Sequence, residues 1–451
     1  MVAQWYPPCE AWPTAATRAS LLSRHLADLG WAPIVLVPDL SAGACACRSC
    51  SAGAANRTVG DPPGVTVVRV PVRPSLPRRA VRRLRPHLES GAPADRGKAA
   101  GEPSPRTAAR LIDRARSLAW LASGANSDWP AKAAAHARQL VQDHAPVAVW
   151  TTSGPFEHLP IGRALRHEFG LAWVADLRDP ASVDVTARHA LEERLVRARR
   201  RRYLHDLLAA DAIIAATGQV AAEDGPWLGK PLDVLVTGFD SARWAAARRD
   251  AVRSERFEIV FTGLLYENYR RPDVFLKGLR RFADSLPSDE GDKVRFVYYG
   301  RSGALLRRIA DEHGAADLVV DGGFISPASV AKTLAEATVL LLLTNEGGDS
   351  GVPGGKFFEY LGAQRPVLAV PGTDEFIRQV FADTGAGVLV NDEAQVAAQL
   401  VHWHGEWKST GSLQFSGDPG AIDRFSSEGS AERLSAVLDN LVAANATRAR
   451  A

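Results

Sequence analysis

Short apolar runs alternate with amphipathic stretches along the second half of the chain. Residues 258–263, 294–300 and 339–343 are rich in aliphatic and aromatic side chains, and the first two runs end at a glycine. Stretches of helical pattern, such as 273–282, lie between them. Continuous apolar strands that alternate with helices are typical of a parallel sheet covered on both faces. The pattern predicts a doubly wound α/β domain over residues 241–415.

The first half of the chain repeats this alternation. Apolar runs at 147–151, 172–176 and 212–215 predict further parallel strands, and 188–209 has the pattern of a long helix. A second doubly wound α/β domain is therefore expected over residues 1–240.

Two segments interrupt the first domain, and a third extends the second. Residues 39–64 are rich in Ser, Ala and Gly, and residues 73–109 are rich in Pro and Arg, so both are predicted to be loop insertions. Residues 416–451 follow the second predicted sheet and have a helical pattern. We expect this tail to pack back on the N-terminal domain.

Composition narrows the class of protein. The 451 residues are 46% hydrophobic and 23% charged, with a net charge of +3, which excludes collagen, a coiled coil and wholesale disorder. No apolar run approaches the ~18 residues of a membrane-spanning helix. The first residues also lack the basic and apolar regions of a secretory signal. These features predict a cytoplasmic protein.

Four cysteines in a chain of this length do not form a disulfide framework. Cys45, Cys47 and Cys50 leave two interpretations, a zinc site completed by Cys9 or His25, and reduced thiols in a loop. Their spacing is not that of a standard zinc knuckle, and we expect no metal.

A glycine-rich junction at residues 351–361 carries the clearest chemical signal. It follows an apolar strand and opens a helix, and Gly354 and Gly355 let backbone N–H groups approach an anion. Lys356 adds a cation, and Glu359 lies one turn further along the same face. A ligand with phosphate and ribose fits this pattern, because a carboxylate can accept hydrogen bonds from a vicinal diol. A solvated Lys–Glu pair in an ordinary strand–loop–helix is the alternative.

The stretch from Lys356 to Ala369 resembles the donor-site signature of glycosyltransferase family 4. Three other segments resemble motifs of the same family, namely 237–240 (TGFD), 323–326 (GFIS) and 172–180 (AWVADLRDP), the last typical of one bacterial branch. The resemblance covers most of residues 1–400. It implies the GT-B fold, α/β throughout, with two Rossmann-like, doubly wound domains facing a central cleft.

The resemblance also implies a reaction. Members of the family move a sugar from a nucleotide-sugar donor to a hydroxyl acceptor with retention, and need no essential metal or other cofactor. UDP- and GDP-sugars are both open, as are cell-surface polysaccharide, glycolipid and secondary-metabolite (for example aminoglycoside) acceptors. Two alternatives share the architecture: a nucleotide-sugar 2-epimerase, and a non-catalytic glycosyltransferase-like partner protein. The second is motivated by Gly351, which occupies the place of the first glutamate in the family's Glu-x7-Glu motif.

The resemblance assigns the donor-binding residues. Glu359 matches the second glutamate of that motif, which holds the nucleotide ribose. The basic pair on the diphosphate follows Gly263, where Leu264 stands in the usual arginine position and Arg270 or Arg271 matches the lysine. Fixed cations there stabilise a leaving diphosphate as the glycosidic bond breaks. A solvated helix start is the alternative for the two arginines.

Four polar residues follow two predicted strands of the first domain. His158 lies soon after the first strand, and Asp176, Arg178 and Asp179 end the second. Open α/β sheets bind ligands at this edge, so we assign all four to positioning and polarising an acceptor hydroxyl. A structural histidine and an Arg–Asp pair that fixes a loop are the alternatives.

Arginine clusters at 78–85 and 199–202 are relevant to which partners the protein binds, and they leave two interpretations. One interpretation is peripheral contact with anionic lipid at the inner face of the membrane. The other is a pair of solvated helix faces. Nucleic acid is not expected, because no aromatic side chains are interleaved with these arginines.

Overall fold

The computed structural model describes residues 1–7, 13–39, 61–73, 128–154, 156–181, 190–267, 271–344 and 355–450. Arg270, Gly354, the four cysteines and the basic cluster at 78–85 lie outside these ranges.

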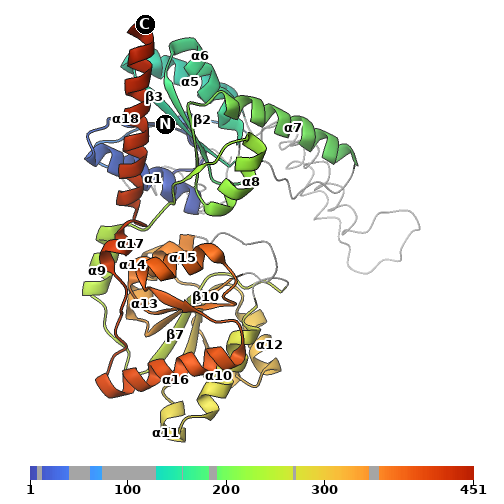
Figure 1. Ribbon diagram of the computed structural model, residues 1–451, viewed down its shortest axis with the longest axis vertical. Coiled ribbons are helices and arrows are strands. Elements are labelled where there is room, and N and C mark those ends of the chain that lie inside the picture. Colours follow the sequence, from blue (N-terminus) through green and yellow to red (C-terminus); the bar gives the residue numbers. More distant parts are fainter. Residues whose placement is uncertain are drawn as a thin grey trace, which may run out of the picture. The chain divides into compact units, whose positions relative to one another are not determined.

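The chain forms two compact units (Figure 1). The first comprises residues 1–235 together with 431–451, and the second comprises residues 236–430. The sequence predicts this division at residue 240 and the start of the tail at residue 416.

The first unit is built on parallel strands. Four of them hydrogen-bond in the order β3 (Ala148–Ser153), β4 (Ala172–Leu177), β5 (Ala212–Ala215) and β6 (Asp233–Val234). A further parallel pair consists of β1 (Ile34–Asp39) and β2 (Thr66–Pro71). Val2 bridges to both β1 and β3 and so joins the two sets.

Helices cover both faces of these strands, as the alternation of side chains along a strand requires. Val149 and Trp173 pack toward α5 (Trp129–His144) and α6 (Leu159–Phe169). The next residue on each strand, Trp150 on β3 and Val174 on β4, packs in a different cluster, with α1 (Pro13–Asp28) and α18 (Ser427–Arg450). Within the described residues of this unit, the other elements are a 3₁₀ turn (Phe156–His158), α7 (Ala190–Leu208) and α8 (Gly218–Leu228).

The C-terminal helix α18 belongs to the core of the first unit. Its Leu434 and Leu438 are buried beside Trp150. The Trp31 indole N–H donates to the Ser435 hydroxyl at 2.9 Å. Figure 1 shows α18 running alongside this unit, so the last residues of the chain pack in the same unit as its N-terminal residues.

The second unit contains one parallel sheet of six strands. Their order is β12 (Gly387–Leu389), β11 (Val367–Val370), β10 (Val339–Leu343), β7 (Phe257–Thr262), β8 (Val294–Tyr299) and β9 (Val319–Asp321). Its helices are α9 (Ser241–Arg249), α10 (Asp273–Asp284), α11 (Ser288–Gly291), α12 (Gly303–Glu312), α13 (Pro327–Glu336), α14 (Gly355–Ala363), α15 (Glu375–Thr384), α16 (Glu393–Thr410) and α17 (Pro419–Asp423), with a 3₁₀ turn at Ala316–Leu318.

Local sequence signals account for several helix starts in this unit. Ser326 caps α13 by accepting a hydrogen bond from the Ser329 N–H, and Pro327 follows it in the first turn. Asp374 and Asp392 cap α15 and α16 in the same way, each accepting a hydrogen bond from a backbone N–H three residues on. Within the described part of the chain, no helix has the length and apolar character needed to cross a bilayer.

Candidate functional site

The strand order of the second unit defines a switch point. β7 lies between β8 and β10. The next strand in the chain, β8, pairs with one edge of β7, and the later strand β10 pairs with its other edge. Open α/β sheets bind ligands beyond the carboxyl ends of the strands at such a point. Gly263 directly follows β7, and α14 is the helix that follows β10. The fold therefore brings two of the predicted donor segments to one place.

Lys356 and Gly263 are in contact at this switch point. The Lys356 Nζ lies 4.2 Å from the centroid of the Phe261 ring, over the end of β7. A Cβ added to Gly263 would overlap with that Nζ and lie 3.1 Å from Cε. Gly263 also has a φ of +127°, which side-chain-bearing residues rarely adopt. Glycine thus provides both the backbone conformation and the space for the ammonium group.

Hydrogen bonds fix the loop that follows Gly263. The Tyr298 hydroxyl donates to the Gly263 carbonyl at 2.8 Å and accepts from the Ser302 N–H at 2.9 Å. The Leu265 N–H donates to the Ser302 hydroxyl oxygen at 3.2 Å. Sequence reasoning missed Tyr298 and Ser302. Their signal was weak, since each is an ordinary residue at or after the end of β8.

Glu359 lies one turn into α14, in the same segment as Lys356, and is half-buried. Burial raises the pKa of its carboxyl group, and the positive charges of Arg243 and Lys356 partly offset this effect. The carboxylate is therefore held in a partly desolvated position near two cations. Such a group is suited to accept hydrogen bonds from ligand hydroxyls.

Arg243 is a residue that sequence reasoning missed. It lies in the first turn of α9, and its backbone N–H donates to the capping Asp240 carboxylate at 3.0 Å. α9 packs on α14, because Arg248 hydrogen-bonds to the Gly362 carbonyl and Trp244 lies against Gly362. Its position three residues after the TGFD segment at 237–240 could have pointed to it.

Arg271 is engaged elsewhere. Its guanidinium donates to both carboxylate oxygens of Asp273, at 2.8 and 2.9 Å, and to Glu312 at 3.2 Å. These hydrogen bonds raise the pKa of Arg271, and the reciprocal contact lowers the pKa of Asp273. The geometry thus argues against the prediction that Arg271 is a diphosphate cation. Asp273, Glu312 and His313 cluster closely enough to hold a metal, but Arg271 already bonds to both carboxylates.

Asp176 of the first unit is paired with a residue that was not singled out. Arg18 donates through Nε and Nη2 to the two carboxylate oxygens of Asp176, at 3.0 and 2.8 Å. The two side chains are 1% and 0% exposed. Arg18 shares a face of α1 with the buried Leu22 and Leu26, four and eight residues on. A charged residue on an apolar face was the available signal for a buried partner.

Arg178 and Asp179 lie at the carboxyl ends of β3 and β4. Arg178 donates from its side chain to the Gly154 carbonyl and from its backbone to the Ser153 carbonyl. A Cβ on Gly154, whose φ is +118°, would overlap the Asp179 carboxylate. Asp179 is exposed, whereas Asp176 is buried. Of the predicted acceptor-side carboxylates, Asp179 is therefore the one open to solvent.

His158 has a structural environment. The ring is fully buried, its Nδ1–H donates to the Thr152 carbonyl at 3.0 Å, and its Nε2 accepts from the Trp129 indole at 2.9 Å. Burial lowers the pKa of His158 to about 4, so the ring is neutral at neutral pH. Both nitrogens are used, and this geometry argues against the prediction that His158 polarises an acceptor.

Comparison with known proteins gives a family match within the second unit, over about a third of the chain. A family model described as Glycosyl transferases group 1 matches residues 256–405, which include β7, α14 and the residues around Gly263, Lys356 and Glu359. A search of curated proteins found no match to the chain.

Solved structures match over both units. A glycosyltransferase from Rickettsia africae aligns with a TM-score of 0.56 and 10% identity, covering 98% of each chain. Anabaena Alr3699/HepE in complex with UDP-glucose aligns with a TM-score of 0.53 and 12% identity, over 97% of this chain and 98% of that one. The N-terminal domain of a trehalose-6-phosphate phosphatase from Candida albicans aligns with a TM-score of 0.55 and 13% identity, covering 98% of each chain.

These findings confirm two predictions. The two parallel-sheet α/β units and the structural likenesses show the GT-B fold with its two Rossmann-like domains. The group 1 domain shows that the protein is a glycosyltransferase enzyme.

Proposed function

We propose that the protein is a retaining glycosyltransferase of family 4 that transfers a sugar from a UDP- or GDP-sugar to a hydroxyl acceptor. The observation that carries this proposal is the placement of the Lys356 ammonium against Gly263 at the switch point, with Glu359 one turn away. The likeness to the Anabaena structure in complex with UDP-glucose supports a nucleotide-sugar donor.

In this proposal each donor residue has a distinct task. Lys356 holds the diphosphate, and the half-buried carboxylate of Glu359 accepts hydrogen bonds from the ribose hydroxyls. Negative charge grows on the diphosphate as its bond to the anomeric carbon breaks. A fixed ammonium therefore stabilises the transition state more than the bound donor. Because the protein supplies this charge, we propose that transfer needs no metal or other cofactor.

On the acceptor side, the exposed Asp179 is the group that would meet the acceptor hydroxyl. Arg178 fixes its loop through the Gly154 and Ser153 carbonyls. Asp176 is saturated by Arg18 and would act only by positioning. We propose an acceptor of cell-surface polysaccharide, glycolipid or secondary-metabolite type.

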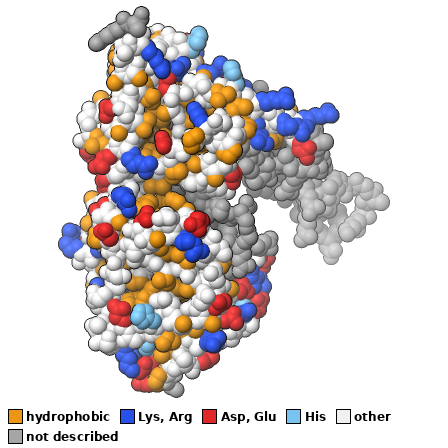
Figure 2. All heavy atoms as spheres, viewed as in Figure 1, with side chains coloured by type: hydrophobic (Ala, Val, Ile, Leu, Met, Phe, Trp, Pro, Cys, Tyr) orange, Lys and Arg blue, Asp and Glu red, His pale blue; other side chains and the backbone are white. Residues whose placement is uncertain are grey.

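The exposed arginines of helix α7 support a proposal about where in the cell this reaction takes place. Figure 2 shows Lys and Arg side chains gathered over this helix. Arg194, Arg197, Arg201 and Arg202 are exposed on it. We propose that the protein works in the cytoplasm, with this face drawn to anionic lipid at the inner face of the membrane, where each basic residue contributes ~1 kcal/mol.

The test is binding followed by turnover. UDP, GDP and a panel of their sugars are titrated into the wild type, Lys356→Ala and Lys332→Ala; Lys332 is an exposed lysine on α13 that serves as the matched control. We expect one nucleotide to bind the wild type and the control equally, and to bind Lys356→Ala at least tenfold more weakly. NMR of the product's anomeric centre then reports retention or inversion.

An incubation with donor alone separates the rival reaction. A 2-epimerase converts its nucleotide-sugar without an acceptor, whereas the proposed transferase leaves the sugar's configuration at C2 unchanged. Equal nucleotide affinity of all three proteins, or epimerisation of the donor, would overturn the proposal.

A further inference from the structure

Asp224 is a buried carboxylate to which the proposed reaction gives no role. It lies on α8 between Val220 and Leu228, four residues from each, and all three side chains are buried. Residues at this spacing share one face of a helix. Val220 and Leu228 belong to the apolar core of the first unit, so the face that α8 turns toward this core has a carboxylate at its middle. Burial of such a group is costly unless polar partners compensate for it.

One partner of Asp224 is the end of the loop that contains Asp179. The Ala181 N–H donates to the Asp224 Oδ2 at 2.8 Å in a buried contact, although the two residues are 43 positions apart in the sequence. Ala181 is 3% exposed and packs in the same apolar cluster as Val220. Since Ala181 comes two residues after Asp179, Asp224 anchors the backbone just beyond the residue that is proposed to meet the acceptor.

The start of this loop is anchored to the end of β3. The Arg178 N–H donates to the Ser153 carbonyl at 3.0 Å, and the Arg178 side chain donates to the Gly154 carbonyl. Only Asp179 and Pro180 lie between Arg178 and the residue held by Asp224. Because proline also fixes its own φ, the backbone of Asp179 has little conformational freedom. The two anchors together therefore determine where the Asp179 carboxylate lies.

We propose that Asp224 is a positioning residue of the acceptor site, which sets the place of the Asp179 carboxylate by holding the Ala181 N–H. The inference rests on the proposed function, in which Asp179 meets the acceptor hydroxyl. Without an oxygen at position 224, the Ala181 N–H is buried and unpaired, and the loop must shift to find another partner. A displacement of about 1 Å at a reacting group reduces the rate on the order of 100-fold.

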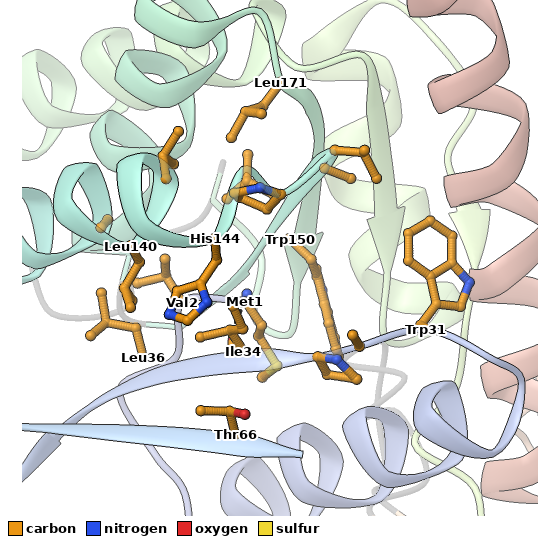
Figure 3. A pocket seen from close by; sticks show the side chains of 18 of the residues that line it. Met1, Val2, Trp31, Ile34, Leu36, Thr66, Leu140, His144, Trp150 and Leu171 are labelled. Atoms are coloured by element: carbon orange, nitrogen blue, oxygen red, sulfur yellow. Dashed lines mark hydrogen bonds between the residues drawn. The ribbon is translucent and has the colours of Figure 1, made fainter. Parts of the chain in front are cut away.

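The opposite end of β4 offers a control for a general loss of stability. Leu171 directly precedes β4 and lines an apolar cavity of about 480 Å³, together with Ile34 and Ala148, the first residues of β1 and β3 (Figure 3). The cavity therefore lies at the amino ends of the strands, whereas Asp179 follows the carboxyl end of β4. Leu171 is 7% exposed, so Leu171→Ala should lower the thermal midpoint of the first unit and leave the loop anchors in place.

The test compares sugar transfer by the wild type, Asp224→Leu, Asp224→Asn and Leu171→Ala, at a temperature at which circular dichroism shows all four to be folded. The donors are a panel of UDP- and GDP-sugars, and the acceptor is octyl β-D-glucopyranoside, or water where that glycoside is not used. We expect Asp224→Leu to lower kcat roughly 10- to 100-fold. Its nucleotide affinity should be unchanged, because Lys356 and Glu359 belong to the second unit.

The two other variants distinguish positioning from stability. Asp224→Asn keeps a carbonyl oxygen for the Ala181 N–H, so it should recover most of the lost kcat. Leu171→Ala should have the kinetics of the wild type despite its lower midpoint. If Asp224→Leu does not fold, Asp224→Ala replaces it, because the smaller side chain leaves room for a water molecule beside the Ala181 N–H.

A double variant tests whether Asp224 acts through Asp179. Asp179→Ala/Asp224→Leu should transfer no more slowly than Asp179→Ala alone, because both changes affect one group. Full additivity would overturn the inference, as would wild-type kinetics in Asp224→Leu, an equal loss in Leu171→Ala, or no recovery in Asp224→Asn. A wild type that moves sugar from no donor to either acceptor would instead refute the proposed function itself.

Discussion

Gly263→Ala is the substitution that isolates the contact on which the donor site depends. The added methyl group would overlap the Lys356 ammonium and lie 3.1 Å from its Cε, in the space that the glycine leaves open. The ammonium must then leave its position over the Phe261 ring. The substitution therefore displaces the cation without removing it.

The expected loss of affinity follows from the bond at stake. A hydrogen bond to a charged group contributes about 1.5–3 kcal/mol. Its loss should weaken nucleotide binding by roughly 10- to 150-fold. The substitution also introduces backbone strain, since Gly263 has a φ of +127°, and such strain is on the order of 1–3 kcal/mol.

A control separates the two effects. Gly314 also has a positive φ, +61°, but no atom lies within 4 Å of a Cβ built there. Gly314→Ala should therefore lose stability in urea while binding nucleotide like the wild type. Calorimetric titration with UDP and GDP provides the affinities.

The double variant Gly263→Ala/Lys356→Ala completes the test. If the methyl group acts through the ammonium, the double variant binds no more weakly than Lys356→Ala alone, because the two changes remove one interaction. Wild-type affinity in Gly263→Ala, or full additivity of the two losses, would refute the reasoning.

Three further predictions concern charge and burial. Glu359→Gln should weaken nucleotide binding yet raise the free energy of unfolding at neutral pH, because burial raises the pKa of Glu359. Urea titrations should show that this gain in stability vanishes below about pH 4.5, where the carboxyl group is protonated in both the folded and the unfolded state. The pKa of His158 is lowered from 6.5 to about 4, so the unfolded chain binds more protons than the folded chain between these pH values. The free energy of unfolding of the first unit should therefore fall by about 3 kcal/mol on acidification across that range. The free energy of unfolding of His158→Asn should depend less steeply on pH, and equal slopes for the variant and the wild type would contradict this. Arg18→Met should lower the free energy of unfolding by about 3–5 kcal/mol, because it leaves the Asp176 carboxylate buried and unpaired. The double variant Arg18→Met/Asp176→Leu should recover most of this loss. Urea unfolding of the four proteins in this cycle measures the coupling energy, and a double variant no more stable than Arg18→Met would contradict the prediction.

The parallel sheets could be predicted because each strand is a short, continuous apolar run. Such runs have no polar face, so both of their faces must be covered, and helices on both sides follow. The order of the strands could not be predicted in the same way. The pairing of β7 with β10 brings residues some 80 positions apart into register, and only the folded sheet shows that this pairing makes the switch point beside Gly263.

The candidate site was predictable where its residues are close in sequence. Lys356 and Glu359 are one turn apart, so their shared face follows from the helix itself. The assignments that the geometry argues against involve partners that are distant in sequence. Trp129 occupies the second nitrogen of His158 from 29 residues away, and Glu312 joins Asp273 in holding Arg271 from 41 residues away. No local pattern distinguishes such a satisfied polar group from an open one.

The buried carboxylate of Asp176 and that of Glu359 have different surroundings, and this difference bears on which of the two can gain from a ligand. In the first unit the buried Asp176 is already neutralised by Arg18, so a ligand gains little by approaching it. In the second unit burial raises the pKa of Glu359, which means that its ionised form is unfavourable without a ligand. Two ligand hydroxyls that donate to this carboxylate would remove that penalty, and the binding free energy would include the relief. A carboxylate that destabilises the empty protein is thus an asset in a site whose ligand has a vicinal diol, because the strain is released only when that ligand binds.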